Sequence, residues 1–229
     1  MRVTVFTAIF GQTDPLLQPT VVMAGVDYVV LSDRDHAVWP YRSVRVDAAA
    51  LGPQLTSRRV KILADHPALG EPDMVLWHDA AFRMDCDPVK LALGLPDDVD
   101  LVAFRHPHRS QIEDEGTAIA NYGWVPRDRV LAQVAAYRAE GFRQDCITST
   151  GFCLRRRTPA VQAFNLFWWA EVERWGWRDQ MSVDYAIWRT GVRLSYIPGH
   201  YRDNPYAKWH WYPARGRRAP APRVVTKRP

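Results

Sequence analysis

Short β-rich runs alternate with helical runs along most of this 229-residue chain, and this order strongly constrains the possible folds. Residues 2–10 and 26–33 are rich in β-branched and aromatic residues and end in small or polar ones, as buried parallel strands do. Residues 56–70 carry apolar side chains at helical spacing, with Thr56 or Ser57 as the cap. We therefore expect an α/β fold with a mostly parallel sheet and helices on both faces.

The same alternation continues to about residue 201. Further strands are expected at residues 73–82, 100–106, 146–156 and 193–201, and further helices at residues 127–141, 158–175 and about 180–190. Asp87 followed by Pro88 signals the start of a short helix that ends at Leu93. The length suits one substantial domain with a continuous core, which we expect over residues 1–212.

Positive charge is concentrated at the C-terminal end of the chain. The net charge is +5, yet residues 215–229 alone carry six Lys and Arg and no acid, so the other 214 residues sum to −1. We expect residues 213–229 to be a flexible, basic, Pro/Arg-rich tail. Such a tail is either a solubilising end or a contact for nucleic acid, an acidic membrane surface or another polyanion.

Several protein classes are excluded as leading interpretations. Three cysteines without repeated spacing form neither a disulfide framework nor a zinc pattern. No apolar run approaches the roughly 20 residues of a membrane span, and the N-terminus is typical of a strand rather than a signal peptide. A cytoplasmic location is the expectation. No G-x-G-x-x-G or P-loop is present, which argues against dinucleotide oxidoreductases and P-loop enzymes.

Polar side chains follow several of the predicted strands. Ligands of open α/β sheets bind outside the carboxyl ends of the strands. This rule selects residues 7–11, Asp33, residues 78–81 and His106. Among the histidines, His106 and His200 are the strongest candidates for metal binding or acid–base chemistry because both follow strand-like runs.

Without a phosphate loop, a nucleoside diphosphate would be held by a carboxylate-bound divalent metal with support from Arg and Lys. Asp79 follows a buried strand directly, and the helix before that strand carries Arg58, Arg59 and Lys61. A literal Asp-x-Asp at residues 85–87 lies farther from the strand end, and helix capping explains Asp87.

The ten tryptophans divide into two groups. Trp168 and Trp175 belong to a helical stripe and are expected in the core. Loop tryptophans suit either stacking on a sugar or base, or packing beneath a loop; they are Trp39, Trp124, Trp209 and Trp211. The acidic residues 113–115 are typical of a solvated helix start, and could also bind acceptor hydroxyls.

Five stretches, in this order, carry a family resemblance: "FTAIFGQTDPL", "SRRVKILADHP", "VLWHDAAFRMDCDP", "FRHPHRSQIEDEGTA" and "WWAEVERWGWRDQMS". Together they resemble the glycosyltransferase-like domain family that includes plant mucilage and pectin-related proteins and bacterial members. The resemblance covers most of residues 4–190. It implies a GT-A fold, a Rossmann-like sheet that binds a nucleotide-sugar donor, usually with Mn²⁺ or Mg²⁺.

A more distant similarity to the glycogenin and galactosyltransferase group implies roles for individual residues. The nucleoside would be held by Thr7, Ala8, Ile9 and Asp33, and the diphosphate would be approached by Arg58 and Lys61. The metal-binding Asp-x-Asp of that group aligns with residues 79–81, where Ala81 replaces the second carboxylate. Gly151 and the pair Asp179-Gln180 would lie near the donor sugar, and His200 and Lys208 correspond to a metal-binding His and a phosphate-binding Lys.

The resulting hypothesis is transfer of a sugar from a UDP or GDP sugar to an acceptor hydroxyl. Asp79 with a metal would neutralise the leaving diphosphate, and Arg58, Arg59 and Lys61 would add positive charge. Asp179 would orient the acceptor or stabilise the oxocarbenium-like sugar. The remaining substrate contacts are expected from His106, Arg109, Gly151, Arg178 and Gln180. His106 and Glu113 are candidates for an inverting base.

Two alternatives remain open at this point. The chain could be a non-catalytic module that binds glycans or nucleotides through a degenerate donor pocket. It could also bind nucleic acid or another polyanion through its basic tail.

Overall fold

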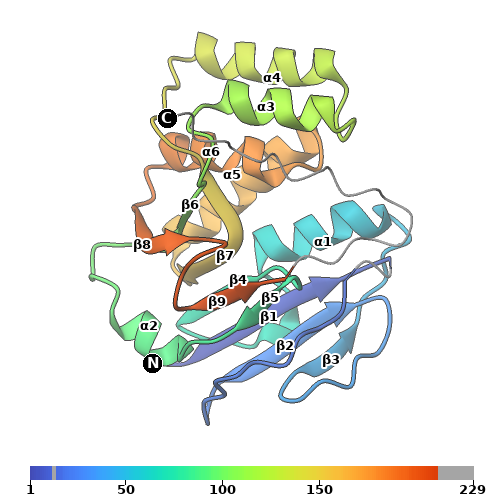
Figure 1. Cartoon of the computed structure of the whole chain (residues 1–229), viewed down its shortest axis with the longest axis vertical. Coiled ribbons are helices and arrows are strands. Elements are labelled where there is room, and N and C mark those ends of the chain that lie inside the picture. The colour runs from blue at the N-terminus through green and yellow to red at the C-terminus, as the bar shows by residue number, and fades with distance from the viewer. Residues whose placement is uncertain (12–13, 211–229) are drawn as a thin grey trace, which may run out of the picture.

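The structure is a computed structural model that describes residues 1–11 and 14–210, and a seven-stranded sheet forms its centre (Figure 1). The strand order is β3-β2-β1-β4-β7-β6-β8. The strands are β1 (Val3–Ile9), β2 (Asp27–Ser32), β3 (Arg42–Arg45), β4 (Met74–His78), β6 (Leu101–Arg105), β7 (Thr148–Arg156) and β8 (Leu194–His200). Only β7 runs antiparallel to its neighbours in this sheet. The expected α/β fold with a mostly parallel sheet, consistent with a Rossmann-like GT-A fold, is confirmed.

Helices cover both faces of the sheet. On one face lie α1 (Gly52–Leu63), α5 (Pro159–Trp175) and α6 (Val183–Thr190), with α3 (Ile112–Asn121) and α4 (Arg127–Ala139) as a further layer beyond them (Figure 1). On the other face lie α2 (Pro88–Leu93) and a two-stranded sheet of β5 (Phe82–Met84) and β9 (Ala207–Trp209). Two 3₁₀ turns complete the elements, η1 (Pro67–Leu69) and η2 (Asp179–Met181).

Local capping signals were reliable at two helices. The Asp87 carboxylate accepts hydrogen bonds from the backbone N–H groups of Val89 and Lys90, at 2.8 and 3.0 Å, and starts α2 as expected. Asp85 pairs instead with Arg83, at 2.8 Å. The literal Asp-x-Asp at 85–87 is therefore a capping residue and an ion-pair partner. Thr158 likewise caps α5.

Two predicted boundaries were wrong. Helix α1 begins at Gly52, so neither Thr56 nor Ser57 is its cap, and Thr56 is buried inside the helix. A proline in the first turn suits a helix start, and here that signal outweighs the later Thr and Ser. The strand expected over 73–82 is two strands, because residues 79–81 form a turn between β4 and β5.

The last turn of α1 is held by the buried side chain of Arg155 on β7. Its guanidinium donates to the backbone carbonyls of Lys61 and Ile62 and to the side chain of Asn165. Carbonyls at a helix C-terminus have no partner within the helix, so a cation there is favourable. This contact fixes α1 against β7 and sets the position of the side chains that α1 presents to the carboxyl ends of β1 and β4.

None of the helices within residues 1–11 and 14–210 is both long and apolar enough to cross a bilayer. The basic tail expected at residues 213–229 and Trp211 lie outside the described part of the chain.

Replacement of Asp87 by Ala tests the capping interpretation. Loss of a side-chain N-cap should lower the free energy of unfolding by about 1 kcal/mol, measured by urea denaturation. The matched control is Asp97→Ala, an exposed carboxylate in the loop that follows α2, which should change stability by less than about 0.5 kcal/mol. Equal stability of the two variants would contradict a capping role for Asp87.

Candidate active site

A pocket of about 610 Å³ lies at the carboxyl ends of β1 and β4. Its walls include Ala8, Gly11, Asp14, Arg58, Asp79 and Trp177. The first turn of α1 also lines it, and that turn has no side-chain cap and no acidic residue. The Gly52 N–H donates to the Ala48 carbonyl and Pro53 has no N–H, so the positive group at this wall is the Arg58 guanidinium, which favours an anionic ligand.

Asp79 sits in the turn directly after β4, and its side chain is 40% exposed. Its backbone N–H donates to the carbonyl of Gly151 at 2.7 Å, and the indole N–H of Trp77 donates to Oδ1 at 2.9 Å. A Cβ atom on Gly151 would lie 3.0 Å from Oδ2 of Asp79 and 2.8 Å from the Phe82 ring. Only glycine fits there without displacing the carboxylate, so Gly151 and Trp77 together set its orientation.

Lys61 joins Asp79 to Asp179. Its ammonium lies 2.7 Å from Oδ2 of Asp179 and 3.6 Å from Oδ1 of Asp79, and it donates to the Thr150 hydroxyl at 2.9 Å. It also lies 5.6 Å from the centre of the Trp77 ring. Only 3% of the Lys61 side chain is exposed. A buried ammonium needs such partners, because an unpaired charge in the interior is strongly unfavourable.

Asp179 is the most buried carboxylate of the cluster, with 4% of its side chain exposed. Arg58 pairs with it at 3.0 Å, and the Thr150 hydroxyl donates to it at 2.9 Å. Burial alone would raise the pKa of Asp179, but the charges of Lys61 and Arg58 outweigh burial and hold the pKa well below its usual range. Its ion pairs therefore stabilise the fold fully above about pH 4, and this contribution falls as the pH drops below that value.

The ends of β1 and β2 meet on the other side of the pocket. The Asp33 carboxylate accepts a hydrogen bond from the Gly11 backbone N–H at 2.8 Å. Ala8 lines the pocket, whereas Ile9 packs into the apolar cluster of the opposite sheet face and Thr7 is fully buried. Of the four residues expected to hold a nucleoside, Ala8 and Asp33 are the ones at or beside the opening.

A second charged cluster surrounds Glu115, which is 1% exposed. Arg109 donates to it, and the Arg178 guanidinium lies 3.6 Å away. Arg109 also contacts the ring of His106, which follows β6. Burial, then the charges of Arg109, His108 and Arg202, lowers the pKa of His106 to about 3. His106 is therefore neutral at pH 7 and a weak base.

The structure separates some of the expected residues from this pocket. Arg59 points to Asp65, 3.5 Å away, and Glu113 is paired with Arg138. Gln180, in contrast, stays near the site, half-buried in η2 beside Asp179. Lys208 is exposed on β9 opposite Arg83.

His200 also differs from its expected position. It pairs with Arg105 at the ends of β8 and β6. The histidine beside the 79–81 turn is His210, whose backbone N–H donates to the Ala81 carbonyl at 2.8 Å. Among the described residues, no group of three or more His, Cys, Asp or Glu side chains could hold a metal by itself.

Three residues of the candidate site were given no individual role from the sequence. Thr150 joins Lys61 to Asp179, and Trp77 holds Asp79. Glu115 belongs to a run interpreted as solvated, yet it is buried. Thr150 and Trp77 could have been found because they lie beside Gly151 and Asp79 in the sequence. For Glu115 the signal is its i, i+3 spacing from the apolar Ile112, which marks the buried face of α3.

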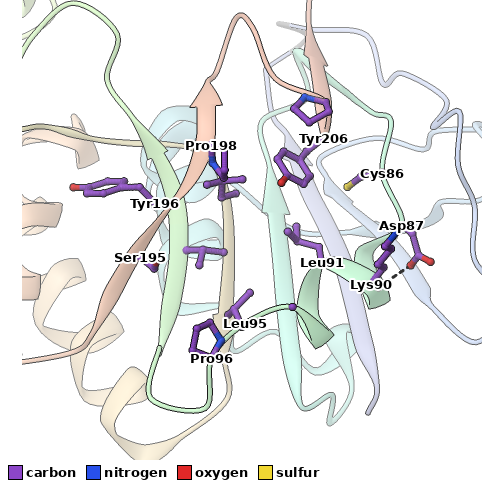
Figure 2. Close-up of a pocket in the computed structure, with 14 residues that line it drawn as sticks. Cys86, Asp87, Lys90, Leu91, Leu95, Pro96, Ser195, Tyr196, Pro198 and Tyr206 are labelled. Carbon is purple, nitrogen blue, oxygen red and sulfur yellow. Dashed lines mark hydrogen bonds between the residues drawn. The ribbon is translucent and has the colours of Figure 1, made fainter.

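A different pocket, of about 480 Å³, lies between α2 and β8 (Figure 2). Its lining includes Leu91, Leu95 and Pro198, with the thiol of Cys86 at one side. Burial, then the charges of Asp87 and Asp85, raises the pKa of Cys86 to about 12, so the thiol stays protonated and is a poor nucleophile. The buried pairing of carboxylates with Lys61 and Arg58 lies instead at the carboxyl ends of β1 and β4.

Replacement of Lys61 by Met tests whether this lysine holds Asp79 and Asp179 together. Asp179 would lose its closest cation, and the free energy of unfolding at pH 7 should fall by about 3 kcal/mol in urea denaturation. The double variant Lys61→Met, Asp179→Asn should lose less than the sum of the two single changes, because the pair is directly coupled. Lys90→Met on the exposed face of α2 is the control, and a Lys61→Met effect no larger than this control would refute the bridge.

Comparison with known families agrees with this geometry. No curated protein matches the chain. The profile described as "TOD1/MUCI70, glycosyltransferase-like domain" matches residues 1–197, which span the sheet through β8 and include Asp79, Gly151 and Asp179. The chain therefore belongs to the TOD1/MUCI70 glycosyltransferase-like domain family.

Proposed function

We propose that this protein is a glycosyltransferase that moves a sugar from a nucleoside-diphosphate sugar to an acceptor hydroxyl. The observation that carries the proposal is the Lys61-bridged pair of carboxylates, Asp79 and Asp179, at the wall of the pocket. Two acids joined by one buried cation are a costly arrangement for a protein that only needs to fold. Their place at the carboxyl ends of parallel strands is where ligands of such sheets bind.

The pocket suits a donor lying across the ends of β1 and β4. Its nucleoside would lie toward Ala8 and Asp33, as expected from the sequence, with UDP and GDP sugars as candidate donors. Its diphosphate would face the Arg58 guanidinium, beside the first turn of α1. Transfer breaks the bond between the sugar C1 and a diphosphate oxygen, which keeps the electron pair. C1 bonds to the acceptor oxygen, and the acceptor's hydroxyl proton passes to the released diphosphate. Arg58 faces the charge that develops on the leaving group.

The two carboxylates would have different tasks. Asp79 opens into the pocket and is the acid that can touch the substrate. Asp179 is too buried for that contact, so its task is to hold Lys61 and Arg58 in place. Asp79 is thus the candidate catalytic residue and Asp179 a positioning residue. Gly151, Arg178 and Gln180 would form the sugar side of the site.

A divalent cation fits this site only if the donor shares in holding it. The pocket lining includes the carboxylates of Asp79 and Asp14, and His210 is tied to the 79–81 turn. Mg²⁺ is commonly bound through one or two carboxylates together with substrate phosphates. Asp79 would be the main protein ligand, and bound Mn²⁺ or Mg²⁺ would neutralise charge on the leaving diphosphate.

Transfer and binding are tested separately. Asp79→Asn should reduce release of nucleoside diphosphate by at least about 100-fold, because it removes charge stabilisation at the reacting centre. Asp85→Asn, a carboxylate outside the pocket, should leave the rate unchanged. Wild-type protein that binds a nucleotide sugar in isothermal titration without releasing diphosphate would refute catalysis and favour the non-catalytic binding module.

Metal dependence is read from melting temperatures. A nucleotide sugar that binds only the native state should raise the melting temperature, and more with Mn²⁺ than with EDTA. Asp79→Asn should remove the Mn²⁺-dependent part of this increase. An equal increase with Mn²⁺ and with EDTA would contradict a shared metal while leaving donor binding intact.

A further inference from the structure

Four neighbouring side chains lead from the pocket wall to the protein surface; we call Trp177, Arg178, Trp124 and Tyr122 the aromatic ladder. Trp177 lines the pocket. The Arg178 guanidinium lies 5.3 Å from the centre of the Trp177 ring and 4.5 Å from that of Trp124. Tyr122 stacks on Trp124, with ring centres 4.8 Å apart and planes inclined by 28°.

The inner members of the ladder have a clear structural task. Only 18% of the Arg178 side chain is exposed, and Glu115 lies 3.6 Å away. Both indole rings lie near this cation, and their own centres are 6.1 Å apart with planes inclined by 49°. The Trp177 indole N–H donates to the Trp124 carbonyl at 3.2 Å. Aromatic faces stabilise a desolvated guanidinium. Burial of Arg178 therefore accounts for Trp124 and Trp177.

Tyr122 is not needed for that task. It follows the last residue of α3 and is 51% exposed. Trp124 covers one face of its ring, and no other ring or cation among the described residues contacts it. A single exposed aromatic residue is common on protein surfaces. This one is distinguished by its alignment with rings that lead to the pocket.

The aromatic ladder runs from the pocket, where the donor sugar would lie, to the protein surface, from which an acceptor would approach. Its inner end borders the pocket beside Arg58, 5.8 Å from the Trp177 ring, and Arg178 directly precedes Asp179 in the chain. An acceptor must approach the donor sugar from outside the pocket. The sugar side of the pocket and the exposed ring of Tyr122 are thus connected by adjoining side chains.

We propose that Tyr122 is a subsite for the acceptor, which stacks the apolar face of a sugar ring on its exposed aromatic face. This rests on the proposed glycosyl transfer and names the acceptor class as an oligosaccharide. A pyranose ring presents a flat array of C–H groups that matches an aromatic face, and a tyrosine supplies this area with little loss of side-chain freedom. A chain of several sugars can occupy both the pocket mouth and Tyr122, whereas a single sugar cannot.

The experiment compares three variants, using the nucleotide sugar that raises the melting temperature most. Tyr122→Ala removes the ring, Tyr122→Phe keeps it, and Trp39→Ala removes another exposed aromatic, 65% exposed and outside the pocket lining. The acceptor probes are β-1,4-linked hexamers of glucose, xylose and mannose, with the corresponding methyl glycosides as single-sugar controls. Donor hydrolysis by water is measured in parallel.

The expected result is a KM for the accepted hexamer that rises about 3- to 10-fold in Tyr122→Ala, with donor hydrolysis unchanged. Tyr122→Phe and Trp39→Ala should behave as the wild type, and the methyl glycosides should be insensitive to all three changes. An unchanged hexamer KM in Tyr122→Ala would overturn the proposal, as would donor hydrolysis without any saccharide acting as acceptor.

Direct titration of the hexamers without donor separates this proposal from the proposed function. Saccharide binding that is weakened in Tyr122→Ala, with no donor release by the wild type, would retain the subsite and reject transfer. Donor hydrolysis with saccharide binding that ignores Tyr122 would retain transfer and reject the subsite.

Discussion

The buried ammonium of Lys61 is the interaction on which the candidate active site depends. It holds two carboxylates near each other, the partly exposed Asp79 after β4 and Asp179 in η2, whose buried charge would be strongly unfavourable alone. Arg58 reinforces it from the preceding turn of the same helix. Any shift of α1 along the sheet would break both pairs at once, so the clamp of Arg155 on the last turn of α1 is part of the same construction.

The site is consequently stiff on one side and open on the other. Asp179, Thr150 and Lys61 are almost fully buried and bonded to one another, whereas Asp79 and Arg58 keep part of their side chains toward the pocket. Pre-organised charge of this kind can act on a developing negative charge without rearranging. The aromatic ladder extends the stiff side outward through Arg178. The Asp179 that pairs with buried Lys61 is thus preceded, one residue earlier in the chain, by the Arg178 that contacts the exposed end of the ladder through Trp124.

Short sequence signals, such as capping residues, predicted helix boundaries well but did not predict which strands pair or which side chains meet. Asp87 before Pro88, Thr158 before Pro159 and Gly191 after α6 each marked a true helix boundary, because caps depend on neighbouring residues alone. The reversal of β7 and the pairing of β5 with β9 had no comparable signal, since a strand's partner is chosen by distant residues. Among the site residues, Asp79, Lys61 and Asp179 were expected at one donor site with separate roles, and their direct contacts had no signal in the sequence. The pairing of Arg59 with Asp65 depends on side-chain direction, which spacing alone does not give.

The late place of β7 in the chain has a consequence for how this protein folds. Because β5, β6 and three helices separate β7 from β4, Lys61 bonds to Thr150 across 89 residues of chain, and closing a loop of that length is slow compared with helix formation. A growing chain that has not yet released β7 leaves the apolar strand β4 as an unpaired edge, which is a template for aggregation. The strand that completes the candidate active site is therefore also the one that protects the half-made sheet.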